Sequence, residues 1–364
     1  MGVESKTYSR TIFNSDIALY VEIYGSRADE AYEEMDAECD ALNRAINGDF
    51  ATSDVYKFNH SVGEIISGEQ NVLGKIDKRY KIEVTRYTYE LVSIAIEAYG
   101  DTDCAYSVTV ERIMSLWGVD ADGLQRVEQT GKPNPLPSQD QIFVAVNGVQ
   151  HPLLIEPVIE DGKYYLIKDD KEITVDLGGI AKGYLADRLA LIAQKHGLTS
   201  AIIDVGGTLR LVGAKPGSSE WKVGVRTPSK YSTDYICAIK LPKDSAVSTS
   251  GTYERGFVNG SLYVCHIIDP LTGYPVTVER SAYDGMLMPK VDYICSATVW
   301  GRDATLCDVM STALCVKGKD GARFIKQAGM SAVMFSSYGT MYTIGDVEFI
   351  DGYDAYKAYE RVAL

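Results

Sequence analysis

The most informative segment of the chain, residues 176–187, reads DLGGIAKGYLAD. It stands between a predicted strand and a predicted helix, and Gly178, Gly179 and Gly183 allow the backbone to turn sharply and to approach a ligand closely. Backbone N–H groups and the positive end of the helix favour an anion there, and Lys182 adds a full positive charge. The segment indicates a phosphate site, although an ordinary glycine-rich turn between strand and helix has the same composition.

A second glycine pair follows the next predicted strand, in the sequence Asp204-Val205-Gly206-Gly207. Two Asp-x-Gly-Gly turns on either side of one helix would lie at the same edge of a sheet. Taken alone, this pair is explained better by simple turn chemistry, because Gly and Asp are common turn residues.

Asp308 and Thr312 are four positions apart in a predicted helix, so their side chains share one face. Carboxylate and hydroxyl oxygens are hard ligands that suit Mg²⁺, which keeps other positions for water and phosphate oxygens. A solvated Asp beside a Thr that bonds back to the helix carbonyl is the ordinary alternative, and it is favoured if no other observation supports a metal.

One histidine stands out because the chain has only 4. His266 lies in residues 248–275, STSGTYERGFVNGSLYVCHIIDPLTGYP, where it falls in a predicted strand just before Asp269-Pro270. Histidine can accept a proton near pH 7. A lone histidine in an apolar strand is more often a hydrogen-bonded structural residue, so both interpretations stay open.

The remaining pattern mixes strands and helices without a regular βαβ repeat, which favours an α+β fold. Predicted helices cover residues 28–46, 91–99, 110–117, 184–195 and 305–316. Predicted strands or hairpins cover residues 10–24, 164–175, 200–204, 221–226, 235–241, 262–268 and 332–350. Residues 132–141 contain three prolines and read as a loop.

Composition excludes some classes of function. With 364 residues, the chain is expected to form one large domain or two interlocked ones. Its net charge of −14 disfavours binding to nucleic acid or to an anionic membrane, and no run of 18 apolar residues predicts a transmembrane segment. The 7 cysteines include no CxxC pair, which argues against a zinc ribbon. Free, scattered cysteines suggest a reducing compartment or an anaerobic setting, and we expect a cytoplasmic location for the chain as printed.

Several motifs in order resemble those of the ApbE family, the FAD:protein FMN transferases. They are DLGGIAKGYLAD, IIDVGG, STSGTYER, HIIDPLTGYPV and DVMSTAL, with SDVYKFN and CAYSVTVERIMSLWG upstream. The resemblance covers nearly the whole chain. It implies one ApbE-type domain over residues 1–364, or two interlocked α+β lobes, with mixed and antiparallel sheets in a T-fold-related architecture.

The resemblance also implies roles for individual residues. Mg²⁺ would be held by the side chains of Asp308 and Thr312 and by the carbonyl of Gly179. His266 would lie near the reacting phosphate, and His266 and Asp308 would be the catalytic residues. The residues expected to contact FAD are Ser15, Ala105, Tyr106, Ser107, Asp176, Lys182 and Ile268.

Two departures from the family pattern fall in the expected FAD pocket. The family commonly has aspartate where this chain has Ser107, and glycine where it has Cys104. The N-terminal methionine–glycine or aspartate–threonine motif is replaced by Ser15-Asp16-Ile17. These changes put the detail of the pocket in question and leave the expected metal ligands intact.

The activity implied by the resemblance is Mg²⁺-dependent transfer of FMN from FAD to a Ser or Thr hydroxyl of another protein, with release of AMP. Family acceptors carry a Ser/Thr-Gly-Ala-Ser/Thr motif, which this chain lacks, and they are typically flavin-carrying subunits of electron-transport complexes. An FAD pyrophosphatase and a non-catalytic FAD carrier are the alternatives. Because many family members are outward-facing lipoproteins, such a location is expected if a leader has been removed.

Overall fold

The computed structural model describes residues 5–13, 17–70, 76–147, 151–283 and 285–364. The chain divides into two compact units. Unit 1 consists of Met1–Asp40, Ile180–Glu254 and Pro289–Leu364, and unit 2 consists of Ala41–Gly179 and Arg255–Met288.

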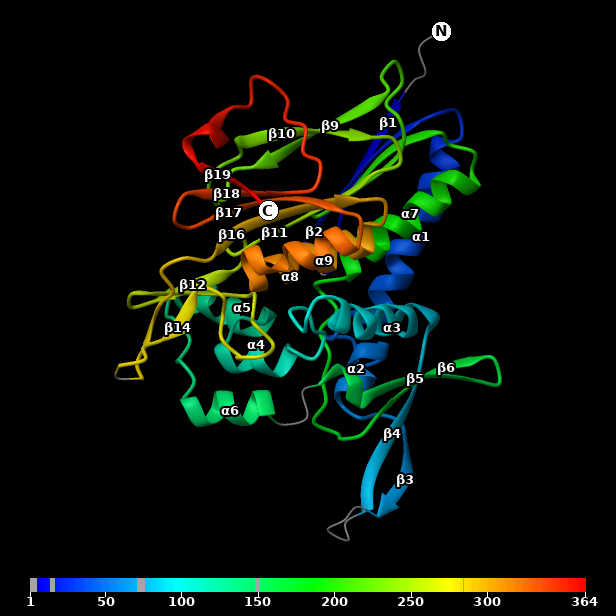
Figure 1. Ribbon diagram of the computed structural model, residues 1–364. Coiled ribbons are helices and arrows are strands. Elements are labelled where there is room, and N and C mark those ends of the chain that lie inside the picture. The colour runs from blue at the N-terminus through cyan, green and yellow to red at the C-terminus, as the bar shows by residue number, and fades with distance from the viewer. Residues whose placement is uncertain (1–4, 14–16, 71–75, 148–150, 284) are drawn as a thin grey trace. The chain divides into compact units, whose positions relative to one another are not determined.

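A nine-stranded sheet forms the centre of unit 1 (Figure 1). Its strands, in spatial order, are β1 (Ser5–Ile12), β2 (Ile17–Tyr24), β7 (Ser200–Val205), β8 (Thr208–Gly213), β11 (Ala246–Gly251), β16 (Ile294–Gly301), β17 (Ser331–Ser336), β18 (Thr340–Ile344) and β19 (Glu360–Ala363). Neighbouring strands are antiparallel except β18 and β19, which are parallel. The mixed sheet and its helices confirm the predicted α+β class.

The two faces of this sheet carry different side chains. Leu211 and Val247 belong to an apolar cluster with the paired strands β9 (Glu220–Arg226) and β10 (Tyr235–Pro242). The alternate residues Thr208 and Ser248 face the other way, towards α8 (Ala304–Lys317), since successive strand residues point to opposite faces. That face is also covered by α7 (Ala181–Lys195), and α9 (Ala322–Gln327) follows α8 after the short 3₁₀ turn η2 (Gly318–Gly321) (Figure 1).

Unit 2 contains a four-stranded sheet and a group of short helices. The sheet runs in the order β3 (Glu64–Gln70), β4 (Ile76–Val84), β6 (Lys163–Lys168) and β5 (Ile155–Glu160). The helices are α2 (Asp54–Asn59), α3 (Arg86–Asp101), α4 (Glu111–Trp117), α5 (Ala121–Thr130) and α6 (Gln139–Asn147), with η1 (Pro152–Leu154) before β5. Two small strand pairs are β12 (Gly256–Asn259) with β13 (Leu262–Cys265) and β14 (Val278–Arg280) with β15 (Leu287–Pro289), the last ending just inside unit 1.

A second apolar core lies in unit 2. Trp117 of α4 is completely buried there, and its indole N–H donates to the carbonyl of Gly273 over 2.7 Å. The buried members of this core are Ile113, Trp117, Val119, Ile142, Ala145, Phe257, Leu262, Val264, Ile268 and Val278. Helix α1 (Ala28–Ile46) begins in unit 1 and ends in unit 2. No helix among the described residues is both long enough and apolar enough to cross a membrane.

Several element predictions are confirmed. The helix over 28–46 has the predicted bounds, the helices expected at 91–99, 110–117, 184–195 and 305–316 are α3, α4, α7 and α8, and the strand expected at 200–204 is β7. Of the chain predicted as a strand or hairpin over 10–24, residues 10–12 and 17–24 lie in the antiparallel pair β1 and β2. The loop predicted over 132–141 is shorter than expected, because α6 begins at Gln139.

The hairpin predicted over 164–175 is wrong. Its first half is β6, which pairs with the preceding strand β5. The two strands are joined by a turn at Asp161 and Gly162, both at positive φ. Residues 169–175 form no strand, and the Lys168 ammonium donates to the carbonyls of Lys171 and Ile173, which a strand would offer to a neighbouring strand. The strand predicted over 262–268 is also too long: β13 ends at Cys265, opposite the first residue of its partner β12.

Candidate functional site

The most unusual side chain in unit 1 is a carboxylate inside a buried helix. Helix α8 begins after Asp303, whose Oδ1 accepts the N–H of Leu306 over 2.8 Å, and most of its residues are inaccessible to water. The Asp308 side chain is only 1% exposed. Burying a carboxylate is costly unless charged or polar partners surround it, so its partners define the site.

Those partners come from three elements. The Lys182 ammonium, on α7, lies 3.0 Å from Asp308 Oδ1 and 3.2 Å from Oδ2. The backbone N–H of Gly183 donates to Oδ2 over 3.1 Å. The hydroxyl oxygens of Ser248 and Thr208 lie 3.2 and 3.5 Å from Oδ1 and 2.8 Å from each other, so their two hydrogens are shared among three contacts. These two residues are directly opposite in the pairing of β11 with β8.

A row of hydroxyls continues from this carboxylate along α8 and β11. Ser250, two positions after Ser248, contacts the hydroxyls of Ser311 and Thr312 at 2.8 and 3.0 Å. Thr312 and Ser311 also donate to the backbone carbonyl of Asp308, over 3.3 and 2.9 Å. The Thr312 back-bond is the ordinary alternative foreseen from sequence, but here it coexists with a contact to β11.

Close packing of α7 against α8 places Lys182 beside the carboxylate. A Cβ on Gly183 would stand 2.2 Å from the carbonyl oxygen of Ala304, so only glycine fits this contact. One turn further along α7, Asp187 accepts the N–H groups of Ala304 and Thr305 over 3.2 and 2.9 Å and caps the start of α8. Burial raises the pKa of the Asp187 carboxyl.

The donor set around Asp308 fits a hard cation such as Mg²⁺. It offers one carboxylate and several hydroxyl oxygens, and Mg²⁺ is commonly bound through one or two carboxylates plus water and phosphate oxygens. Within the ranges that the structure describes, no three His, Cys, Asp or Glu side chains gather as a metal cluster. Oxygen ligands other than carboxylates would therefore complete the coordination.

In unit 2, the glycine-rich turn lies against residues predicted to border the flavin. The N–H of Asp176 donates to the carbonyl of Val108 over 2.7 Å, and Asp176 Oδ1 accepts the N–H of Gly178 over 2.8 Å. A Cβ on Gly179 would lie 3.1 Å from the ring of Tyr106. Ala105 and Tyr106 are buried. The structure thus brings these parts of the predicted FAD site together within one unit, and their roles stay predictions.

Ser107 is also buried, and its hydroxyl shares a hydrogen bond of 2.9 Å with that of Thr109. The same Ser107 oxygen accepts the Thr109 N–H over 3.2 Å. Just upstream, Asp103 and Cys104 both adopt positive φ, of 53° and 62°. This left-handed backbone explains why glycine suits position 104 better than cysteine does.

Two side chains to which the sequence analysis assigned no role hold the segment leading to Asp176. The buried Lys168 ammonium donates to the carbonyls of Phe58, Ile173 and Lys171, over 2.5, 2.7 and 3.2 Å. Its Nζ also lies 4.5 Å from the centre of the Phe58 ring. Burial lowers the pKa of Lys168 to about 8.

The second of these side chains is Asn59, the last residue of α2. Its amide donates to the carbonyl of Val175 over 3.0 Å and accepts the N–H of Val175 over 2.8 Å. Both backbone groups of the residue before Asp176 are therefore fixed by one amide.

The predicted base, His266, lies one residue beyond β13 and not inside a strand. Its Nδ1 is 3.1 Å from the carbonyl oxygen of Arg255. Ile268, predicted to line the flavin pocket, is 6% exposed and belongs to the apolar core of unit 2. Ser15 lies outside the described residues.

The second Asp-x-Gly-Gly turn connects β7 to β8. Asp204 Oδ1 accepts the N–H of Gly207 over 2.8 Å, and burial raises the pKa of the Asp204 carboxyl. The first such turn, at Asp176, follows an irregular segment and not a strand. The strand expected before the first turn is therefore absent from the structure, and Asp204 serves as a turn residue.

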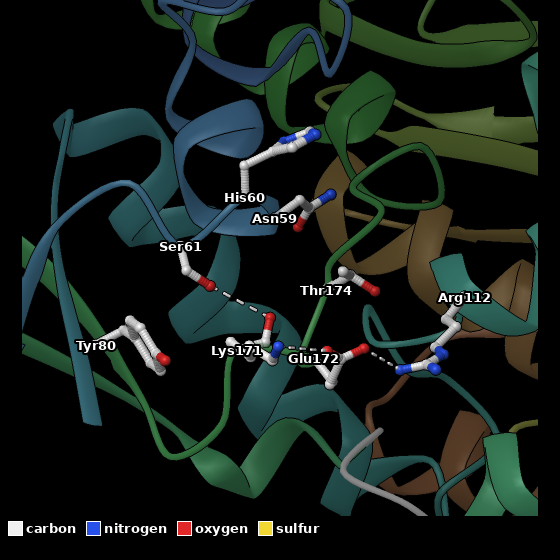
Figure 2. A pocket seen from close by; sticks show the side chains of 8 residues that line it. All are labelled: Asn59, His60, Ser61, Tyr80, Arg112, Lys171, Glu172 and Thr174. Atoms are coloured by element: carbon white, nitrogen blue, oxygen red, sulfur yellow. Dashed lines mark hydrogen bonds and ion pairs between the residues drawn. The ribbon is translucent and has the colours of Figure 1, made fainter. Parts of the chain in front are cut away.

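A cavity of about 420 Å³ opens elsewhere in unit 2 (Figure 2). Arg112 and Glu172 form an ion pair of 2.7 Å in its wall, and Lys171 lies 3.6 Å from the same Glu172 carboxylate. The lining residues are Asn59, His60, Ser61, Tyr80, Arg112, Lys171, Glu172 and Thr174. None of the residues predicted from sequence as site residues lines it, and its basic groups are partly paired to Glu172.

Sequence reasoning missed the hydroxyl partners of Asp308, although one signal was present. Ser248 and Ser250 are two positions apart in a strand, so they point to the same face. Nothing in the pattern showed that α8 covers that face.

Comparison with known proteins shows to which family the chain belongs. The sequence profile of the ApbE family matches residues 11–335. The chain belongs to the ApbE family. Among curated proteins, it is 28% identical over 253 residues to the FAD:protein FMN transferase of Vibrio cholerae, covering 69% of this chain and 67% of that protein. It is also 28% identical over 256 residues to the Escherichia coli K12 enzyme of the same name, covering 69% and 65%. The alignments thus span about two thirds of the length of these relatives.

Solved structures of the family share the fold. The Pseudomonas stutzeri flavinyl transferase ApbE, in its apo form, superposes with a TM-score of 0.70 at 20% identity, covering 94% of this chain and 96% of that one. The ApbE protein of Thermotoga maritima superposes with a TM-score of 0.71 at 25% identity, covering 99% and 100%. These likenesses confirm the ApbE architecture expected from the motifs.

Proposed function

We propose that this protein is a transferase that moves FMN from FAD to a Ser or Thr hydroxyl of a separate acceptor protein and releases AMP, with Mg²⁺ as cofactor. Family membership supports the reaction class, since the matched relatives are named FAD:protein FMN transferases. The observation that carries the proposal is the buried Asp308 carboxylate, set among hydroxyls and beside the Lys182 ammonium. A purely structural helix would have no use for that combination, because an apolar residue there costs less.

Bond changes in the proposed reaction are simple. The acceptor hydroxyl oxygen forms a bond to the FMN phosphorus, and the bond from that phosphorus to the bridging oxygen of AMP breaks. The proton leaves the hydroxyl as the new bond forms. We assign its acceptance to His266, whose Nδ1 must carry a hydrogen to donate to the Arg255 carbonyl, so that Nε2 holds the lone pair in the neutral ring.

Asp308 and Thr312 would hold the cation in this proposal, and Ser250 orients the Thr312 hydroxyl through their contact of 3.0 Å. When bound, Mg²⁺ would neutralise charge on the diphosphate. The chain itself fixes the carboxylate from both sides, through the Gly183 N–H on α7 and the Ser248 hydroxyl on β11. Such positioning and electrostatic preorganisation supply much of the acceleration in phosphoryl-type transfer.

The direct test incubates the full chain with FAD, Mg²⁺ and an acceptor domain that carries the Ser/Thr-Gly-Ala-Ser/Thr motif. Intact mass spectrometry and AMP release are read together. A gain of one FMN on the acceptor with matching AMP, lost in EDTA, is the expected result. AMP without a mass gain would identify a pyrophosphatase instead. Bound FAD with neither product would identify a carrier.

The assignment of Asp308 is tested by Asp308→Asn, which keeps the size of the side chain and one of its two acceptor oxygens. We expect transfer to fall by about a hundredfold or more, because the carboxylate charge is lost where charge must be stabilised. Asp320→Asn is the matched control, since Asp320 is exposed in the turn after α8. Transfer at the wild-type rate by Asp308→Asn would show that the assignment is wrong.

A further inference from the structure

The ion pair between Lys182 and Asp308 has a consequence for how a cation reaches the carboxylate. Each carboxylate oxygen can accept about two hydrogen bonds. Oδ2 is occupied by the Lys182 ammonium at 3.2 Å and the Gly183 N–H at 3.1 Å. Oδ1 is occupied by the ammonium at 3.0 Å and the Ser248 hydroxyl at 3.2 Å, with Thr208 at 3.5 Å. An incoming cation must displace one of these partners.

Of these partners, Lys182 is the one that can both move and change the charge balance. The Gly183 N–H is fixed by the helix backbone and by the contact of Gly183 with Ala304. The two hydroxyls are neutral and can rotate in place. Lys182 carries a full charge on a flexible side chain that is 19% exposed, so it has a route towards solvent. A divalent cation at the carboxylate would also repel the ammonium directly.

We propose that Lys182 and the divalent cation are alternative counter-ions of Asp308, and that metal binding releases the Lys182 ammonium to the anionic substrate. This inference rests on the proposed function for the identity of the anion, a diphosphate. Lys182 then has two successive roles. It neutralises the buried carboxylate in the protein alone, and it contacts phosphate oxygens once the metal has taken its place. Metal and diphosphate are thereby coupled, because each stabilises the arrangement that the other needs.

The test measures metal binding without flavin. Mn²⁺ is titrated into the full chain and free Mn²⁺ is read by electron paramagnetic resonance. Lys182→Met removes the competing counter-ion, and we expect Mn²⁺ to bind about tenfold more tightly than to wild type, within the range usual for coupled sites. Lys182→Arg keeps a cation that pairs well with a carboxylate, so Mn²⁺ should bind more weakly than to wild type. Mn²⁺ affinity is therefore expected to be highest in Lys182→Met, intermediate in wild type and lowest in Lys182→Arg.

Lys195→Met is the matched control, because it removes the same charge from the same helix. Lys195 is 66% exposed and pairs with Glu34 at 2.6 Å. Its Mn²⁺ affinity should equal that of wild type. Asp308→Asn combined with Lys182→Met should bind no Mn²⁺ at this site.

If Lys195→Met bound Mn²⁺ as much more tightly as Lys182→Met does, the effect would come from the net charge of the protein, and the proposal would be overturned. Unchanged or weaker binding in Lys182→Met, or no Mn²⁺ binding in any variant, would also overturn it. If Lys182→Met fails to fold, the comparison of wild type with Lys182→Arg decides, since equal affinities refute competition. The measurement involves no flavin transfer, so its failure is distinct from failure of the proposed function, which the acceptor assay reads.

Discussion

Replacing Lys168 with methionine should destabilise unit 2 and thereby loosen the segment that leads to Asp176. The variant removes three hydrogen bonds of the ammonium, to the carbonyl oxygens of Phe58, Lys171 and Ile173. Ser61 still donates to the first two, through its N–H and its hydroxyl, so only the Ile173 carbonyl loses its sole donor among the described residues. At about 2 kcal/mol for each hydrogen bond to a charged group, the loss is about 6 kcal/mol. Removing the buried ammonium also removes the cost of burying its charge, which offsets part of this loss. A pKa lowered from 10.5 to about 8 corresponds to about 3.4 kcal/mol. The net loss at pH 7 is about 3 kcal/mol.

The same pKa gives the pH dependence of this effect. Below pH 8, Lys168 is protonated in both the folded and the unfolded chain, so its titration does not change stability with pH. Between about pH 8 and 10.5 the unfolded chain binds more protons at this group, so wild-type stability rises with pH. From pH 7 to pH 9 the gain is about 1.4 kcal/mol. Lys168→Met lacks this group, and the gap between the two proteins should widen to about 4 kcal/mol at pH 9.

The assay is urea unfolding of both proteins at pH 7 and pH 9, followed by hydrogen exchange of α3 and β6 peptides so that unit 2 is read by itself. Lys163→Met is the control: Lys163 lies on the same strand, is 57% exposed and pairs with Glu83, so its removal should leave the free energy of unfolding nearly unchanged at either pH. A gap between wild type and Lys168→Met that stays constant from pH 7 to pH 9 would refute the reasoning. It would mean that the three carbonyls offset burial and keep the ammonium at its ordinary pKa.

Two further substitutions, with Gly100→Ala as a control, test the packing and the hydrogen bonds that position the site. Gly183→Ala should destabilise unit 1 by about 1–3 kcal/mol in thermal or urea unfolding, because its Cβ would meet the Ala304 carbonyl at 2.2 Å. Gly100→Ala, in a helix with open space around it, should be neutral or stabilising by up to about 1 kcal/mol. Asn59→Ala should cost about 1–3 kcal/mol and weaken FAD binding in equilibrium titration, because both backbone groups of Val175 lose their partner. Unchanged FAD affinity in a folded Asn59→Ala would contradict a positioning role.

Local patterns were sufficient to predict much of the fold. The apolar spacing of residues 28–46 gave the bounds of α1, and the short apolar run at 200–204 identified β7. These elements follow rules that act over a few residues, such as helical periodicity and alternation in strands. The hairpin predicted over 164–175 was wrong because the burial of one side chain, which local alternation does not predict, decides how residues 169–175 fold. A lysine is almost never fully buried, yet Lys168 is, and it binds the carbonyls that a second strand would have used.

The candidate site was predictable in its parts but not in its assembly. The spacing of Asp308 and Thr312 indicated possible metal ligands, and the glycines around Lys182 indicated an anion site as a separate feature. The structure shows that Lys182 and Asp308 are one feature, joined by an ion pair across 126 positions of sequence. The hydroxyls of Thr208 and Ser248 reach the same carboxylate through the register of β8 with β11, which no local pattern encodes.

The composition of α8 explains why its site is hard to see from sequence. Apolar and small residues surround Asp308 on every side of the helix, so the segment reads as core. A carboxylate in that setting lowers stability unless its partners are placed with care, and an apolar replacement would stabilise the helix more simply. The partners come from α7, β8 and β11. Helix α7 also approaches α8 so closely that a methyl group on Gly183 does not fit between the two helices. So much structure devoted to one charged group is better explained by a task for that charge than by folding. Because the Lys182 ammonium contacts both carboxylate oxygens, the proposed task begins with an exchange of cations.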